Sequence, residues 1–308
     1  MAVARKRALV LWVAIACAAI DPGASGQAPT DVSDADLAAV SARTIALGAA
    51  GGGKIADLPL EVYVARVLTG EGEPNAPEAT QQALAVAIRT YAVFNAGRHR
   101  REGFDLCDSV HCQVPRAAAS ASARRAAFAT AGSILTYKGQ PAEIFYSASC
   151  GGRSETAAAA WPKTGVPHPY LRSVKDDVHH DDAPWTLEMS LADLQVRLQQ
   201  IGLGGRLKNV QVASRTKSDR AAVLKLSGMY PDRLAGDQFR AAIGTTIVRS
   251  TAFSVKKDGD TIRFTGRGYG HGVGMCVIGA GRRARRGESM IDILKAYYPG
   301  VTIQVLTS

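Results

Sequence analysis

The sequence has little of several features that define whole classes of protein. Aromatic residues make up only 6% of its 308 residues, and they do not interleave with basic residues as in a nucleic-acid groove, so we expect no nucleic-acid partner. Five cysteines are too few to act as the scaffold of so long a chain. We find no internal repeat. What remains is a chain that is 46% hydrophobic, enough for a real core in one large domain or two smaller ones.

Long apolar runs are also missing, except near the start of the chain. Residues 5–7 are basic, residues 8–20 are apolar but too short for a comfortable membrane span, and Ala24-Ser25-Gly26 resembles a cleavage site. Residues 14–16, just before Cys17, make a poor lipidation box. We therefore predict a signal peptide at residues 1–26 and an exported protein, in the periplasm or on the cell-wall side of the membrane. An uncleaved signal would be its only contact with the membrane.

Positive charge is in excess, with a formal net charge of +10 for the whole sequence. Such a balance favours a polyanionic partner, which for an exported protein means wall polymers or anionic lipids. A basic surface kept for solubility explains the charge equally well.

The spacing of apolar residues predicts an α+β fold of helices mixed with short antiparallel hairpins. After residue 185 the pattern of predicted helices and strands changes, which indicates an inserted lobe. The predicted helices cover residues 33–40, 59–70, 77–95, 117–131, 191–201, 235–243 and 291–297, and the predicted hairpins pair residues 44–47 with 54–57, 134–137 with 142–147, and 254–257 with 261–265.

One predicted helix ends at two acidic residues. Pro59 suits its first turn, and Gly70, Gly72 and Pro74 end it. Glu71 and Glu73 are left at this break, near the negative end of the helix macrodipole. A carboxylate so poorly placed for stability is a candidate catalytic group, although an ordinary solvated glutamate gives the same pattern.

Histidine and cysteine gather in the irregular stretch that follows. Two thiolates and two imidazoles suit tetrahedral zinc, and the candidate ligands are His99, Cys107, His111 and Cys112. A disulfide between Cys107 and Cys112 is the alternative.

Two further segments carry reactive side chains. Glycines surround His271 in residues 266–274, which predicts a tight turn near a ligand or, equally, a structural corner with a satisfied histidine. Residues 147–152 contain Cys150, which with His271 would make a thiol nucleophile only if the two side chains met.

Four separate motifs in order resemble the stage II sporulation protein D / LytB amidase-enhancer family (SpoIID-like). They are Val67-Leu-Thr-Gly-Glu71 with Ala87-Ile-Arg-Thr-Tyr91, Phe104 to Val114, Tyr146-Ser-Ala-Ser-Cys-Gly-Gly152 with Tyr170 to Val174, and Gly266 to Met275 with Tyr297-Tyr-Pro-Gly300. The resemblance divides the chain into a linker with the first strand (27–53), an N-terminal core (54–184), a variable lobe (185–250) and a C-terminal part (251–308).

The resemblance implies a peptidoglycan glycan-strand hydrolase, a lytic transglycosylase that acts on peptide-stripped strands and leaves 1,6-anhydro ends. It assigns the catalytic acid to Glu71, structural zinc to the His/Cys cluster, and substrate contacts to Arg89, Tyr91, Tyr146, Ser149 and His271. Gly72-Glu73-Pro74 stands where the family continues Met-Pro, which leaves Glu73 as the alternative acid. Because the family includes amidase enhancers, a non-catalytic wall-binding partner of an N-acetylmuramoyl-L-alanine amidase is the alternative function.

Overall fold

The computed structural model describes residues 31–53, 55–176 and 183–306. Helices and several small, mainly antiparallel sheets make up this part of the chain, which confirms the α+β prediction. The predicted signal peptide lies outside the described residues. In the described part, no helix combines the length and the apolar character needed to cross a membrane.

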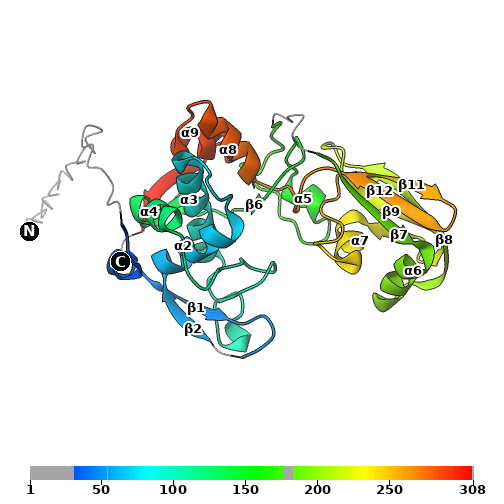
Figure 1. Ribbon diagram of the computed structural model, residues 1–308, viewed down its shortest axis with the longest axis horizontal. Coiled ribbons are helices and arrows are strands. Elements are labelled where there is room, and N and C mark those ends of the chain that lie inside the picture. The colour runs from blue at the N-terminus through cyan, green and yellow to red at the C-terminus, as the bar shows by residue number, and fades with distance from the viewer. Residues whose placement is uncertain (1–30, 54, 177–182, 307–308) are drawn as a thin grey trace, which may run out of the picture.

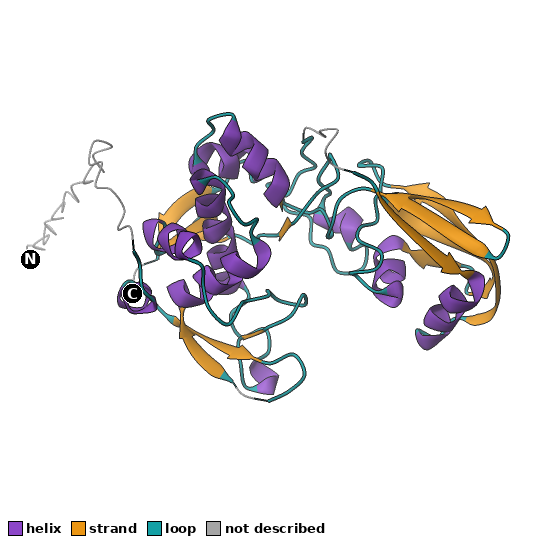
Figure 2. Cartoon of the chain, in the orientation of Figure 1, coloured by secondary structure: helices purple, strands orange, loops and turns teal. Residues whose placement is uncertain are grey.

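The molecule has two lobes, each with its own hydrophobic core (Figure 1). The described part of the chain, residues 31–306, begins and ends in the first lobe, and the second lobe lies between these two parts of the sequence (Figure 1). Figure 2 shows that helices dominate the first lobe and strands the second.

Helices packed around the buried helix α3 build the first lobe. Ten consecutive residues of α3, from Ala83 to Ala92, are buried, and four of them are alanines that allow close helix packing. Serine side chains cap α1 and α4 by accepting backbone N–H groups of the first turn. The helices of this lobe are α1 (Asp34–Ala39), α2 (Leu60–Glu71), α3 (Glu78–Phe94), α4 (Ala121–Ala129), α5 (Ala157–Ala160), α8 (Val277–Arg285) and α9 (Met290–Tyr297).

Three small sheets join distant parts of the chain within this lobe. β1 (Thr44–Gly48) pairs antiparallel with β2 (Ala56–Pro59), as predicted, and parallel with β3 (Leu106–Cys107). β4 (Ser133–Tyr137) lies between β5 (Gln140–Pro141) and β14 (Thr302–Val305). β6 (Tyr146–Ser147) runs parallel to β13 (Met275–Cys276), so the C-terminal part of the chain supports the strand that carries Tyr146.

Two three-stranded sheets and two helices form the second lobe. Its elements are β7 (Trp185–Ser190), α6 (Leu191–Gln200), β8 (Gly204–Arg215), β9 (Ala221–Tyr230), β10 (Arg233–Ala235), α7 (Gly236–Ile243), β11 (Phe253–Asp258) and β12 (Thr261–Gly266). Phe253, Ile262 and Phe264 belong to its core, because β12 pairs with both β7 and β11. We therefore propose that the lobe extends through β12 instead of ending at residue 250.

Candidate active site and metal cluster

Glu71 is the last residue of α2, and its carboxylate turns into the first lobe. The backbone N–H of Val114 donates to Oε1 at 2.6 Å, and the hydroxyl of Tyr146 donates to Oε2. Burial raises the pKa of Glu71, while these two hydrogen bonds act in the opposite direction. The group is therefore a carboxyl with an upward-shifted pKa, held in one orientation by two donors.

Glu73 has a different environment. It lines an open groove together with Thr69, Gln81 and Ser120, and one of its carboxylate oxygens lies beside Gly281 of α8. Glu73 is not among the groups that shift the pKa of Glu71. The two acids that the sequence left as alternatives thus occupy separate surroundings.

A chain of side-chain hydrogen bonds fixes the direction of the Tyr146 hydroxyl. Tyr63 donates to Oε1 of Gln113 at 2.9 Å, and Nε2 of Gln113 donates to the Tyr146 oxygen at 2.7 Å. Because the Tyr146 oxygen accepts from Gln113, its own proton is directed at Glu71. Burial raises the pKa values of both Tyr63 and Tyr146 well above the ordinary value, so both phenols stay protonated.

His271, in the glycine-rich turn, lies beside the backbone segment that carries Tyr146. Its ring packs against Trp161 at a centroid distance of 4.9 Å and against Phe145 at 6.1 Å. Its Nδ1 accepts the N–H of Val273 at 3.0 Å. The histidine is therefore hydrogen-bonded within the turn and lies beside the segment that carries Tyr146, and its contact with a ligand stays a prediction.

Electrostatics keep His271 uncharged. Burial, with the charges of Arg240 and Arg220 added to it, lowers the pKa of His271 to about 3. Gly274 makes the close packing here possible: its φ is 72°, and a Cβ at this position would lie 1.9 Å from the carbonyl oxygen of Phe145.

Tyr91 and Ser149, two further predicted substrate contacts, come from different elements of the first lobe. Tyr91 is 7% exposed on α3, and burial raises its pKa to about 12. Ser149 exchanges two backbone hydrogen bonds with Tyr269, at 3.0 and 2.9 Å, and thereby fixes the glycine-rich turn against residues 147–152.

Arg89 was expected to contact the substrate, but its position in the structure contradicts this prediction. Its guanidinium is completely buried and forms an ion pair with Glu61, which is also completely buried. Further hydrogen bonds run from Nη1 to the Ser133 carbonyl at 3.0 Å and from Nη2 to the Ala127 carbonyl at 3.2 Å. Arg89 therefore ties α2, α3, α4 and β4 together and has no face open to a substrate.

Replacing Arg89 by Met is expected to lower the free energy of unfolding by about 3 to 5 kcal/mol, because the Glu61 carboxylate is left buried and unpaired. Urea unfolding followed by circular dichroism measures this loss. The double variant Arg89→Met/Glu61→Leu should recover much of it, since no charge remains buried. A cost below about 1 kcal/mol for the single variant would contradict this structural role.

Cys150 and His271 do not form a nucleophilic pair. The Cys150 thiol is buried and donates to Oδ2 of Asp176 at 3.4 Å. A hydrogen bond with Cys276, and then burial, raise the pKa of Cys150, so the thiolate needed for nucleophilic attack is disfavoured. The structure therefore does not support Cys150 as a thiol nucleophile paired with His271.

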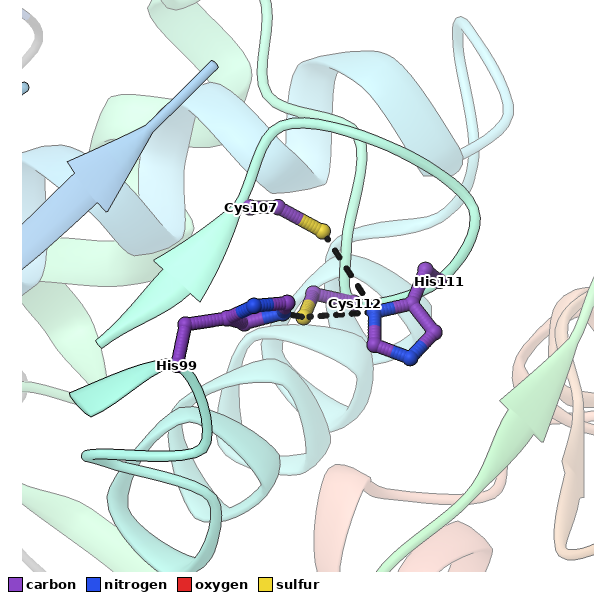
Figure 3. A group of neighbouring side chains, drawn as sticks. All are labelled: His99, Cys107, His111 and Cys112. Atoms are coloured by element: carbon purple, nitrogen blue, oxygen red, sulfur yellow. Dashed lines mark hydrogen bonds between the residues drawn. The ribbon is translucent and has the colours of Figure 1, made fainter. Parts of the chain in front are cut away.

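The predicted metal ligands come together as a four-residue cluster (Figure 3). Their candidate ligand atoms all lie within 4.8 Å of one another, and the four residues are His99, Cys107, His111 and Cys112. Nδ1 of His111 is 3.6 Å from the Cys107 sulfur and 3.7 Å from the Cys112 sulfur. Nε2 of His99 is 3.4 Å from the Cys112 sulfur.

The local backbone allows neighbouring residues of the cluster to converge. A turn in which the N–H of Cys112 donates to the Ser109 carbonyl at 2.9 Å bends the chain between β3 and Cys112. Nδ1 of His99 contacts Oε1 of Glu102 at 2.8 Å, which orients Nε2 into the cluster, as is common around protein metal sites. Cys107 and Cys112 carry free sulfurs, so the cluster offers two thiols and two imidazoles that could hold a metal ion.

The sequence pattern missed Tyr63, Gln113 and the N–H of Val114. Tyr63 lies among the apolar residues of α2, so it resembles an ordinary core residue. Gln113 and Val114 directly follow Cys112 and belong to the motif Phe104 to Val114. Membership in this motif is the only sequence signal that points to them. Trp161, beside His271, followed an alanine-rich stretch without any signal.

Similarity to known proteins covers both lobes. Residues 49–137 match the family model described as Stage II sporulation protein (SpoIID), and residues 184–274 match a Domain of unknown function (DUF8618). The chain is 30% identical over 275 residues to Stage II sporulation protein D of Bacillus subtilis (strain 168), covering 81% of this chain and 75% of that protein.

Two other relatives give the range of this similarity. An uncharacterized protein of Brachyspira hyodysenteriae is 32% identical over 252 residues, which are 80% of this chain and 67% of that protein. The Amidase enhancer of Bacillus subtilis (strain 168) is 28% identical over 273 residues, covering 72% of this chain and 37% of that protein. With a relative at 30% identity over most of both chains, and the same family model matched in the first lobe, this protein belongs to the SpoIID family.

Proposed function

We propose that this protein is an exported lytic transglycosylase that cleaves peptide-stripped glycan strands of peptidoglycan, with Glu71 as the catalytic acid. The observation that carries the proposal is the Glu71 carboxyl itself. It has a pKa raised by burial and a fixed orientation between Val114 and Tyr146. A carboxyl of this kind stays protonated closer to neutral pH, as a general acid must.

One carboxyl group is sufficient for this reaction. Protonated Glu71 gives its proton to the glycosidic oxygen as the bond to the sugar breaks and an oxocarbenium-like state develops. The 6-hydroxyl of the muramyl residue then attacks the same carbon, and the Glu71 carboxylate takes up the hydroxyl proton. The product is a 1,6-anhydro end, and no second carboxylate is needed to activate water.

Val114 and Tyr146 act in the second step of this reaction, in which Glu71 is a carboxylate. Both donate hydrogen bonds to Glu71, so they stabilise the carboxylate that exists after the first proton transfer. The neutral His271 and the half-buried Trp161 lie next to the Tyr146 segment, and we propose that Tyr91, Tyr146 and His271 contact the glycan, with Ser149 holding the turn of His271 in place.

Replacing Tyr146 by Phe is expected to shift the alkaline limb of the rate profile to higher pH. The Tyr146 hydrogen bond lowers the pKa of Glu71, so its loss raises that pKa and keeps the acid protonated further into the alkaline range. The maximal rate should fall about 10-fold to 100-fold, because the carboxylate formed in the reaction loses a donor. Initial rates of glycan cleavage across pH measure both effects.

Tyr63→Phe is the matched control, because it removes a hydroxyl from the same network one hydrogen-bonded side chain further from Glu71. It should shift the limb in the same direction but less. A limb that stays in place or moves to lower pH in Tyr146→Phe would mean that Tyr146 does not tune the acid.

We propose that zinc occupies the cluster of His99, Cys107, His111 and Cys112. Four protein ligands complete a tetrahedral shell, so the ion would be structural and would hold no reacting water. The ion would also hold the active site in place, because Gln113 and Val114 come directly after Cys112 in the sequence. Gln113 orients Tyr146, and Val114 orients Glu71.

Digestion of purified glycan strands tests the proposed activity. Strands freed of peptides by an amidase are incubated with the protein, and the products are analysed by mass spectrometry for 1,6-anhydro ends. Products that lack these ends, or no cleavage at all, would contradict the proposal.

The relative named Amidase enhancer favours a second candidate, a wall-binding protein that stimulates an N-acetylmuramoyl-L-alanine amidase. In that case the protein would leave denuded strands intact and would accelerate release of peptides from whole sacculi by the amidase.

A further inference from the structure

A second cluster of sulfur and carboxylate groups lies away from Glu71, in the first lobe. The sulfurs of Cys150 and Cys276 and a carboxylate oxygen of Asp176 all lie within 4.8 Å of one another, and all three residues are at most 5% exposed. Cys150 follows β6, and Cys276 ends β13, the strand paired with β6. Neither sulfur takes part in the site described above.

We propose that Cys150 and Cys276 form a disulfide when the protein is outside the cytoplasm, and that this bond closes the base of the second lobe. The backbone nitrogen of Cys150 donates to the Cys276 sulfur at 3.2 Å, which brings the two residues within the reach of a disulfide. Extracytoplasmic compartments are where such bonds form and persist.

Hydrogen bonds hold both sulfurs of this pair in fixed positions. The Cys276 sulfur caps the N-terminus of α8 by accepting the N–H of Gly279 at 3.3 Å, in addition to the N–H of Cys150. The Cys150 thiol donates to the Asp176 carboxylate at 3.4 Å, which fixes its orientation beside Cys276.

Close packing favours a disulfide over a metal ion at this cluster. The hydroxyl of Tyr297 donates to both oxygens of Asp176 at 2.7 Å, and Nε of Arg283 lies 3.9 Å from one of them. A Cβ on Gly279 would lie 2.3 Å from Asp176 and Tyr297, so α8 leaves no spare space here. A disulfide needs no additional volume, whereas a metal would need a fourth ligand beside a guanidinium.

The oxidation requires a disulfide-containing oxidant, such as a thiol oxidase or a small-molecule disulfide. One cysteine thiolate attacks the oxidant, forms a mixed disulfide and releases one thiol. The thiolate of the other cysteine then attacks that mixed disulfide, forms the Cys150–Cys276 bond and releases the second thiol. Two electrons and two protons pass from the pair to the oxidant. Both sulfurs are buried, so the exchange takes place while the chain folds or opens locally.

The bond would join chain segments on either side of the second lobe. All of the strands and helices from β7 to β12 lie between Cys150 and Cys276 in the sequence (Figure 1). Closing so long a loop restricts the unfolded chain strongly, and oxidation should raise the melting temperature by about 5 to 10 °C.

Thiol mapping on the full-length protein tests the proposal. The protein is equilibrated with oxidised glutathione, denatured in parallel samples with and without EDTA, alkylated with and without prior reduction, and digested for mass spectrometry. We expect Cys150 and Cys276 to resist alkylation until they are reduced, and to appear as one cross-linked peptide 2 Da lighter than the two separate thiol peptides. Melting curves of the oxidised and the reduced protein should differ by the shift given above.

Cys276→Ser is the matched variant, because the serine hydroxyl can still accept the N–H of Gly279 and cap α8. It should abolish both the cross-linked peptide and the redox dependence of the melting temperature. Alkylation of both cysteines in wild type without reduction would overturn the proposal. Protection that EDTA alone removes would overturn it as well, and would indicate a bound metal.

Discussion

Glu71→Gln is expected to reduce the release of 1,6-anhydro products from denuded glycan at least about 1,000-fold, with the fold unchanged. The amide has the shape of the carboxyl group, and its one oxygen can still accept a hydrogen bond from Val114 or from Tyr146. It has no acidic proton to give to the glycosidic oxygen and cannot later take one from the 6-hydroxyl. Mass spectrometry of the products measures the rate, and a melting curve checks the fold.

Glu73→Gln is the matched control, because it makes the same chemical change two residues away. Glu73 lines the open groove beside Gly281 and takes no part in the hydrogen bonds of Tyr146 and Gln113. Its variant should keep a rate within about threefold of wild type, in line with a small change at a position outside the reaction. If Glu73→Gln lost activity and Glu71→Gln kept it, the catalytic acid would be Glu73.

The helices could be predicted closely because their patterns are local. α3, α6, α7 and α9 begin and end within about one residue of the spans expected from apolar spacing and capping residues. α4 begins at Ala121, four residues later than expected, because Ser120 caps the helix and the chain before it is not helical. α8 has three arginines in its last turn and two glycines within it, so apolar spacing does not predict a helix there.

The site could be predicted only in part because its partners lie far apart in sequence. Glu71 stood out through its place at a helix break, but the partner that orients it, Tyr146, is 75 residues away. The substrate contact expected of Arg89 came from the family resemblance. A motif does not reveal an ion-pair partner, and that partner, Glu61, lies 28 residues earlier on another helix. The cluster of His99, Cys107, His111 and Cys112 was predictable because its four residues fall within one short stretch.

Removing the metal is expected to disable the active site while most of the first lobe stays folded. Wild type should contain one zinc per chain by elemental analysis. Extraction with a strong chelator should lower the cleavage rate about 100-fold, because Gln113 and Val114 lose their fixed positions beside Tyr146 and Glu71, and a misplacement of about 1 Å has an effect of that size. Acid should have the same effect, since protons compete with the metal for the two thiolates and imidazoles and loosen it as the pH falls.

Cys112→Ser should reproduce the metal-free state, while Cys150→Ser, at a cysteine outside the cluster, should retain one zinc per chain.

Limited proteolysis supplies a readout that does not depend on activity. Without metal, cleavage should begin in the stretch between His99 and Cys112, which forms no helix longer than the three residues Arg100–Glu102. Burial raises the pKa of the Cys112 thiol to about 11 in the metal-free cluster, so the released cysteine remains largely protonated at neutral pH. A folded, active protein without zinc, with Cys107 and Cys112 joined as a disulfide, would contradict the metal assignment and restore the alternative that the sequence left open.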